Sequence, residues 1–149
     1  MSRSQKLAIL ALRLTLGWLF FYAGISKIVN PNWTAGGYQK GAQSLTGLYD
    51  WLALPVNIGW VSFLAVWGLL LIGLSLLFGF LTRWASLAGI IMMALFYFPA
   101  LNFPRVGTTS YIIDDHIIYI AIFVFLAFIN AGEFWGLDSY FFRHASKGK

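Results

Sequence analysis

The first long apolar segment, residues 7–28, carries charged and small residues on one helical face. That face consists of positions spaced four, three, four and three residues apart: Arg13, Gly17, Phe20, Gly24 and Lys27. At about 100° per residue they fall within an arc of about 80°, and a rise of about 1.5 Å per residue separates Arg13 from Lys27 by about 21 Å. Because charges inside a membrane-spanning helix usually face protein or water rather than lipid, we expect this face to pack against protein.

The composition indicates an integral membrane protein. Of the 149 residues, 60% are hydrophobic and 10% are charged, which is too little polar surface for a soluble domain. Three further apolar segments, residues 58–81, 84–101 and 112–131, approach the length of about 20 residues needed to cross the hydrocarbon core. The sequence therefore predicts an all-α fold, a single membrane domain over residues 1–149 built as an antiparallel bundle of four transmembrane helices.

The distribution of Lys and Arg predicts the orientation. With both termini inside, the inner side holds Arg3, Lys6, Arg83, Arg143, Lys147 and Lys149. The outer side holds Lys27, Lys40 and Arg105. We therefore expect both termini to be cytoplasmic in a prokaryotic cytoplasmic membrane. The first segment is too long for a cleaved signal and has no small-residue cleavage site, so we expect it to be retained.

Several classes of site are excluded by residue counts. The chain has no cysteine, so thiolate metal sites and Cys-x-x-Cys redox chemistry are ruled out. Its two histidines, His116 and His144, lack the spacing of a metal cage or an axial haem pair, so we expect no bound metal or haem. The net charge of +5 fits topology and attraction to anionic lipid, and in a chain of this composition it does not indicate nucleic-acid binding.

The first outer loop, residues 29–57, is rich in aromatic side chains. With the start of the next helix it supplies Trp33, Tyr38, Tyr49, Trp51 and Trp60. Residues 45–52 suit a short interfacial helix. Two interpretations stay open: an ordinary aromatic belt at the headgroups, or a lid over a cavity mouth in which Lys40 meets an anion. The second outer loop, residues 102–111, carries Arg105.

Asp114, Asp115 and His116 stand together at the start of the last predicted helix. Acids are favoured at a helix N-terminus by the macrodipole, so capping explains one of them but not all three. Asp115 and Glu133 are eighteen positions apart, or five helical turns, so they share a face if the helix continues that far.

We hypothesise that the first and last predicted helices pack together through two ion pairs. Near the outer surface Lys27 would meet Asp115, and deeper in the bundle Arg13 would meet Glu133, each pair relieving the desolvation cost of its members. Two alternatives stay open. Arg83 is a rival partner for Glu133, and Arg13 can instead extend to the inner headgroups.

Three motifs resemble the DoxX/DoxD superfamily. They are the stripe from Arg13 to Lys27, the Gly68 to Thr82-Arg83 stretch with its spaced glycines, and the Ile113-Asp114-Asp115-His116 opening of the last predicted helix. Two further motifs are most similar to DoxD: Asn30-Pro31-x-Trp33 followed by Gly37-Tyr38, and the closing Phe134-Trp135-Gly136-Leu137-Asp138. That branch is the small membrane subunit of thiosulfate:quinone oxidoreductase. The motifs that carry the resemblance extend over nearly the whole chain.

The resemblance implies that thiosulfate is oxidised to tetrathionate on the outer side and that membrane quinone accepts the electrons. A DoxA-like subunit is the partner that the resemblance implies. The lipid bilayer and a second copy of the chain in a homo-oligomer are further candidate partners. His116, with Asp115 as orienting acid and Asp114 beside it, would handle protons. Lys27, Lys40 and Arg105 would bind the sulfur oxyanion. The alternatives are a non-catalytic membrane scaffold or assembly partner and, less favoured, a small transporter.

Overall fold

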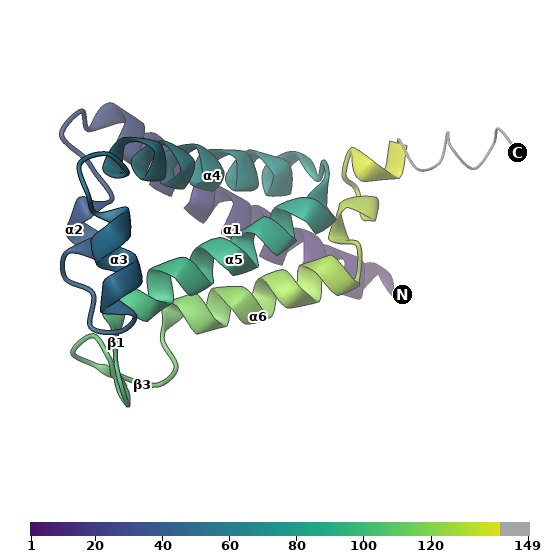
Figure 1. Cartoon of the computed structure of the whole chain (residues 1–149). Helices are drawn as coiled ribbons and strands as arrows, with labels where there is room; N and C mark the ends of the chain where they lie inside the picture. Colours follow the sequence, from purple (N-terminus) through teal and green to yellow (C-terminus); the bar gives the residue numbers. More distant parts are fainter. Residues whose placement is uncertain (141–149) are drawn as a thin grey trace, which may run out of the picture.

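The computed structural model describes residues 1–140, in which four longer helices run side by side (Figure 1). These helices are α1 (Arg3–Val29), α4 (Ile58–Phe78), α5 (Thr82–Ala100) and α6 (Asp115–Phe128). The N-terminus and the segment that ends at Tyr140 lie at one end of the bundle, here called the terminal end. The connecting segments gather at the opposite end, here called the loop end. Arg143, His144, Lys147 and Lys149 lie outside the described residues.

Three of these helices, α1, α4 and α5, are long and apolar enough to cross a membrane. The first begins before the predicted residue 7 because Ser2 and Gln5 form a capping box, in which each side chain accepts from the other's backbone N–H. The second and third agree closely with the predicted ranges 58–81 and 84–101. The apolar character of these helices indicates a membrane protein.

The last helix is shorter than predicted. It has 14 residues, whereas the apolar pattern extends over residues 112–131. Ile112 has a left-handed backbone with φ 59°. Two residues later Asp114 is the N-cap of the helix, which begins at Asp115. At the other end Asn130 is also left-handed, with φ 47°, and the chain continues in the short 3₁₀ helix η1 (Ala131–Glu133). Local backbone turns therefore cut the helix at both ends of the apolar run.

The loop end holds the short elements of the fold. The first loop contains α2 (Gly36–Gln39) and α3 (Thr46–Leu52), so a short helix is present where residues 45–52 predicted one. Between α5 and α6 the chain forms three two-residue strands, β1 (Leu101–Asn102), β2 (Arg105–Val106) and β3 (Ser110–Tyr111). They pair antiparallel in the order β1-β2-β3. The all-α prediction is thus corrected by one small sheet.

The predicted stripe of α1 does face protein. Arg13, Gly17, Phe20 and Gly24 are all buried, and α1 packs along α4. The backbones of the two helices approach closely at Gly73 of α4, where an added Cβ would lie 2.3 Å from the backbone nitrogen of Phe21. Small residues allow helices to approach this closely. The expectation that α1 packs along the last predicted helix is met only locally, where the ring of Phe20 contacts Tyr119 and Phe123 of α6. Most of α6 packs along α5 instead.

The pair α1–α4 and the pair α5–α6 meet through aromatic side chains in the core. Phe123 of α6 is fully buried, and its ring lies over Gly89 of α5. On its other side the ring centroid of Phe20 from α1 lies 5.1 Å away at an interplanar angle of 83°. Edge-to-face pairs of this kind are favourable beyond the area they bury. Phe123 therefore connects α1, α5 and α6 at one point.

Candidate functional site

A cavity of about 310 Å³ lies at the loop end, between the α2–α3 segment and the helices α4 and α5. Its wall is apolar, and ring-bearing side chains together with a methionine form much of it. These are Trp33, Tyr38, Tyr49, Trp60, Met92 and Phe96. The α2–α3 segment, here called the lid, thus lies over a cavity whose wall also includes Met92 and Phe96 of α5.

Tyr49 attaches α3 to α5 by a hydrogen bond to a carbonyl that Pro99 leaves free. Proline has no N–H, so Pro99 leaves the carbonyl of Leu95, four residues earlier, without its helical donor. The hydroxyl of Tyr49 donates to that carbonyl at 2.9 Å, and Tyr49 is only 2% exposed. Burial raises the pKa of the Tyr49 phenol above its ordinary value, so the group stays a neutral donor.

Further hydrogen bonds fix the rest of the lid. The backbone N–H of Gln43 donates to the carbonyl of Pro99 at 2.9 Å, and the Ser44 hydroxyl donates to the carbonyl of Leu101 at 2.5 Å. On the α4 side, the backbone N–H of Ala35 donates to Oγ of Ser62 at 3.0 Å. The α2–α3 segment is therefore attached to both α4 and α5.

Gln39, a residue that lines the cavity, carries an unpaired polar atom that is itself buried. Gln39, the last residue of α2, is 5% exposed and lines the cavity. Its Oε1 is buried without a hydrogen-bond partner among residues 1–140. Buried polar atoms are paired in most native structures, so an exception of this kind calls for an explanation. Sequence reasoning missed Gln39, because a glutamine beside glycines in a loop carries no distinctive signal.

Of the predicted proton-handling residues, the structure joins His116 to Asp114 rather than to Asp115. Nδ1 of His116 lies 2.6 Å from Oδ2 of Asp114. Oδ1 of Asp114 accepts from the backbone N–H of His116 at 3.1 Å and of Ile117 at 3.3 Å, so Asp114 is the N-cap of α6. Asp115 is exposed in the first turn. The acid that contacts His116 is therefore Asp114 and not Asp115, the acid expected from the sequence.

The predicted oxyanion ligands lie at the loop end, but the structure does not join them. Nζ of Lys27 donates to the carbonyl of Ala23 at 3.3 Å and lies 5.3 Å from the ring centroid of Trp33, a cation–π geometry. Lys40 is exposed directly after α2, and Arg105 is exposed on β2. Within the described part of the chain, no salt bridge links Lys27 to Asp115.

At the terminal end, Arg13 binds carbonyl groups and not Glu133. It is 2% exposed. Its Nη1 donates to the carbonyls of Ala131 at 3.0 Å and Phe134 at 3.1 Å, and its Nη2 to that of Trp135 at 3.4 Å. The predicted pair with Glu133 is wrong because α6 ends at Phe128. The five-turn register is lost there, and the Glu133 side chain is exposed.

Asp138 completes this terminal cluster. Its Oδ1 accepts from the backbone N–H of Leu81 at 2.7 Å and its Oδ2 from that of Thr82 at 3.0 Å, which caps the start of α5 from far along the chain. The Asp138 carboxylate also interacts electrostatically with Arg13. The closing motif over residues 134–138 thus supplies carbonyls to Arg13 and a cap to α5. Sequence reasoning noticed the motif but not this role.

Glu133 and its predicted rival partner Arg83 lie near this cluster, in one pocket of about 410 Å³. No ion pair joins them in residues 1–140. The same part of the chain holds no group of three or more His, Cys, Asp or Glu side chains arranged to bind a metal ion.

Comparison with known proteins identifies one family. The family described as DoxX matches residues 8–100, which runs from the first turns of α1 to the end of α5. No curated protein and no solved structure matches the chain. The matched range includes the α1 stripe, the lid and the cavity, and it stops before α6 and the closing motif.

Proposed function

The chain belongs to the DoxX family, and from this premise we propose that it is the DoxD-type membrane subunit of a thiosulfate:quinone oxidoreductase. The observation that carries the proposal is the ring-lined cavity under α2 and α3, which we assign to the quinone ring. The thiosulfate specificity is supported by the resemblance of the motifs at residues 30–38 and 134–138 to DoxD. The quinone assignment is supported by the cavity itself.

The cavity fits a flat lipophilic ring in size and chemistry. Its volume of about 310 Å³ lies at the lower end of the range of about 300–1,000 Å³ for ligand sites. Trp33, Tyr38 and Phe96 offer aromatic surface to such a ring. Leu64 of α4 both lines the cavity and is 56% exposed. An opening beside Leu64 would admit a lipid-soluble tail from the bilayer.

The proposed reaction balances with quinone as the oxidant. Two thiosulfate ions each give one electron and join through a new S–S bond to form tetrathionate, while the quinone takes up two electrons and two protons to become the quinol. In this proposal Lys27, Lys40 and Arg105 attract the sulfur oxyanion to the loop end. His116, paired with Asp114, exchanges protons with the medium.

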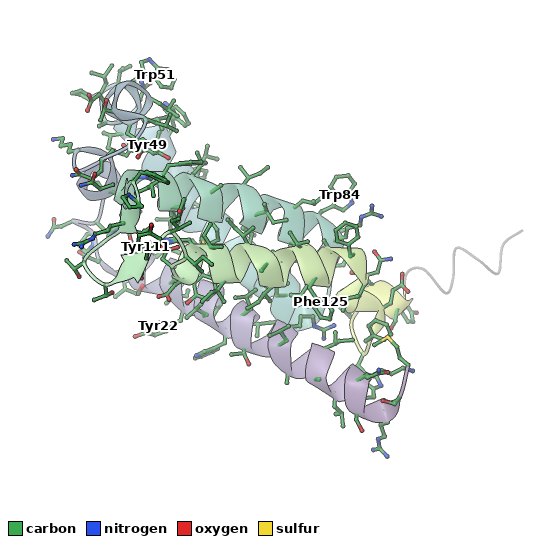
Figure 2. The ribbon with its side chains drawn as sticks, turned by 90° about the horizontal axis from the view of Figure 1, so that it is seen from below. Tyr22, Tyr49, Trp51, Trp84, Tyr111 and Phe125 are labelled. Carbon is green, nitrogen blue, oxygen red and sulfur yellow. The ribbon has the colours of Figure 1, made fainter. Side chains whose placement is uncertain are left out.

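We further propose that α6 is a fourth membrane crossing, which puts both termini in the cytoplasm of a prokaryote. Its 14 residues span about 21 Å, and apolar residues at both of its ends extend the hydrophobic length. Exposed aromatic side chains support a membrane–water interface at each end of the bundle. Trp51 and Tyr111 lie at the loop end, and Trp84 lies at the terminal end, near the start of α5 (Figure 2). On this topology α3 lies at the outer membrane surface.

The test is thiosulfate-dependent reduction of decylubiquinone by the purified protein, alone and with any co-purifying DoxA-like subunit. We expect reduction in at least one condition. Ala65→Phe, which fills the cavity from α4, should lower the rate about tenfold or more. Its control is Ala88→Phe on an exposed position of α5, which should not. Absence of thiosulfate-dependent reduction in both conditions would overturn the proposal.

A second candidate, a non-catalytic membrane scaffold, is favoured by one specific observation. Asp114 and His116 already serve the cap of α6, and among the described residues neither lines the cavity. His116→Ala separates the two functions. Lost quinone reduction with normal expression and melting temperature supports a chemical role, whereas lost protein with a normal rate per folded molecule supports a role in assembly.

A further inference from the structure

The pocket of about 410 Å³ at the terminal end, here called the charged pocket, holds a cation and an anion that are not paired with each other. Arg83 at the start of α5 and Glu133 of η1 both line it, and both side chains are exposed. Within residues 1–140 neither of them forms a salt bridge. Both charges are therefore available to a molecule that enters the pocket.

The elements that carry these two charges are held in place. Asp138 caps the start of α5 directly before Arg83, and the carbonyl of Ala131, two residues before Glu133, accepts from Arg13 at 3.0 Å. Asp138 also lines the charged pocket, but both of its carboxylate oxygens already accept backbone N–H groups. Glu133 is thus the acid that is open to a ligand, and Arg83 is the base.

An apolar groove continues from the charged pocket along α4 and α5, two helices apolar enough to cross a membrane. The groove has a volume of about 570 Å³ and shares Leu81 and Trp84 with the charged pocket. Its α4 wall extends from Gly68 to Phe78, which is about 15 Å of helix, or half of a hydrocarbon core of about 30 Å. Trp84 is 69% exposed and points outwards (Figure 2). The groove therefore matches one membrane leaflet in length.

The charged pocket and the groove together fit one molecule with a zwitterionic headgroup and an apolar chain. The guanidinium of Arg83 can donate to a phosphate, and the carboxylate of Glu133 can accept from a protonated amine. We propose that this site binds phosphatidylethanolamine, with its phosphate at Arg83, its amine at Glu133 and one acyl chain in the groove.

The charges of the pocket select among phospholipids. Phosphatidylglycerol has a phosphate but no amine, so Glu133 would stay unpaired beside an anionic lipid. Phosphatidylcholine has a quaternary ammonium, which carries no N–H donor for Glu133. The site goes beyond the proposed oxidoreductase function, because it requires only that α4 and α5 cross a membrane, and its charged pocket lies at the opposite end of the bundle from the ring-lined cavity.

The experiment counts the lipids bound to the purified full-length protein by native mass spectrometry in detergent. Dioleoyl phosphatidylethanolamine, phosphatidylcholine and phosphatidylglycerol are compared at equal concentrations. The wild type should bind one phosphatidylethanolamine about tenfold more tightly than either other lipid, as expected for a hydrogen bond between charged groups. Soluble glycerophosphoethanolamine, which has the headgroup without the chains, should bind at least about tenfold more weakly than the lipid.

Two charge variants assign the two headgroup contacts. Glu133→Ala should abolish the preference for phosphatidylethanolamine over phosphatidylcholine. Arg83→Ala should weaken the binding of all three lipids, because all three carry the phosphate. The matched controls Asp50→Ala and Arg3→Ala, at exposed positions outside the site, should bind lipid as the wild type does.

A third variant tests the groove. Ala85→Phe places a ring in the groove and should weaken phosphatidylethanolamine binding, whereas Ala121→Phe, at an exposed position of α6, should not. Lipid-free melting temperatures report the folding of every variant, and phosphatidylethanolamine should raise that of the wild type more than phosphatidylcholine does.

Four results would each overturn the inference. They are equal wild-type affinities for the three lipids, an unchanged preference in Glu133→Ala, unchanged binding in a folded Ala85→Phe protein, and equally tight binding of glycerophosphoethanolamine. The last result would identify a soluble headgroup, and not a lipid, as the ligand of the charged pocket. A selective lipid site in a protein without thiosulfate-dependent turnover would leave the inference standing and overturn the proposed function.

Discussion

At the scale of single residues, Arg13 shows how a charge is kept inside this bundle. Its guanidinium is surrounded by three carbonyl groups and lies near one carboxylate, that of Asp138. Carbonyl oxygens are the negative ends of peptide dipoles, so a cluster of them stabilises a buried cation. The planar fork of arginine matches such a cluster, because two nitrogens reach three acceptors at once.

The conservative variant Arg13→Lys tests this geometry. A lysine keeps the charge but presents a single ammonium nitrogen, so at least one carbonyl loses its donor. We expect the free energy of unfolding to fall by about 2 kcal/mol or more, measured by thermal denaturation in detergent. Arg3→Lys, at an exposed position of the same helix, is the control. Equal melting temperatures for the two variants would contradict the assigned role.

The sequence placed Arg13 on a face expected to pack against protein, with extension to the inner headgroups left open, and it did not predict the partners of Arg13. Spacing alone placed Arg13, Gly17 and Gly24 on one face, and all three are buried. The partner chosen for Arg13 was wrong because the left-handed turn at Asn130 depends on how the closing segment folds back over α4 and α5. Gln39 was missed for a related reason: an unpaired atom is defined by its surroundings, which only the fold assembles.

At the scale of elements, the attachment of α3 to α5 depends on a proline. Tyr49 donates to the Leu95 carbonyl that Pro99 leaves free. This link between a loop helix and a membrane-spanning helix was not predictable from sequence, because it joins residues 46 positions apart. It holds the lid over the cavity.

A double-mutant cycle measures this link. Tyr49→Phe should lower stability by about 1–2 kcal/mol, since it leaves a buried carbonyl unpaired. In a Pro99→Ala background the restored N–H of residue 99 bonds to Leu95, so Tyr49→Phe should cost clearly less there. Thermal unfolding of the four proteins gives the coupling. If the loss from Tyr49→Phe is the same in both backgrounds, the proline is not the cause.

The crossing of α1 and α4 is also decided by single positions. At Gly73 an added Cβ would meet Phe21 N, Phe21 Cα and Gly17 O at 2.3, 2.6 and 2.9 Å, all of them backbone atoms that cannot rotate away. The position of α4 was predictable from its apolar run, but the pairing of α1 with α4 was not. Small residues occur on several helices, and their spacing does not determine which helix each one packs against.

Two glycine variants of α4 form a matched pair. Gly73→Ala should destabilise the protein by about 3 kcal/mol, at the upper end of overpacking costs, because the helices must separate. Gly59→Ala meets open space at the start of the same helix and should be neutral or stabilising by up to about 1 kcal/mol. Detergent-solubilised yield and melting temperature report both. A stable Gly73→Ala protein would show that the α1–α4 contact tolerates widening.

At the scale of the whole molecule, the bundle is closed differently at its two ends. The loop end holds an apolar cavity under a hydrogen-bonded lid, and the terminal end holds the charged cluster of Arg13 and Asp138. The proposed site for a lipophilic ring therefore lies at one end of the bundle, and the polar contacts of Arg13 and Asp138 lie at the other. The proposed orientation directs the cavity outwards.

Because the chain has no cysteine, single cysteines can report this orientation directly. We expect Thr108→Cys, exposed in the loop between β2 and β3, to react with a membrane-impermeant maleimide in intact cells. Ser2→Cys and Trp135→Cys, both exposed at the terminal end, should react only after permeabilisation. Labelling of all three only after permeabilisation would mean that the loop at Thr108 is not outside.

The position of residue 135 separates the remaining possibilities. If Trp135→Cys is labelled in intact cells while Ser2→Cys is not, α6 does not cross and the protein has three spans. If both are labelled and Thr108→Cys is not, the whole bundle is inverted. A 14-residue helix of about 21 Å is short for a hydrocarbon core of about 30 Å. Whether Ser2 and Trp135 lie on the same side of the membrane is therefore the decisive measurement. The same side for both requires α6, with its flanking apolar residues, to cross.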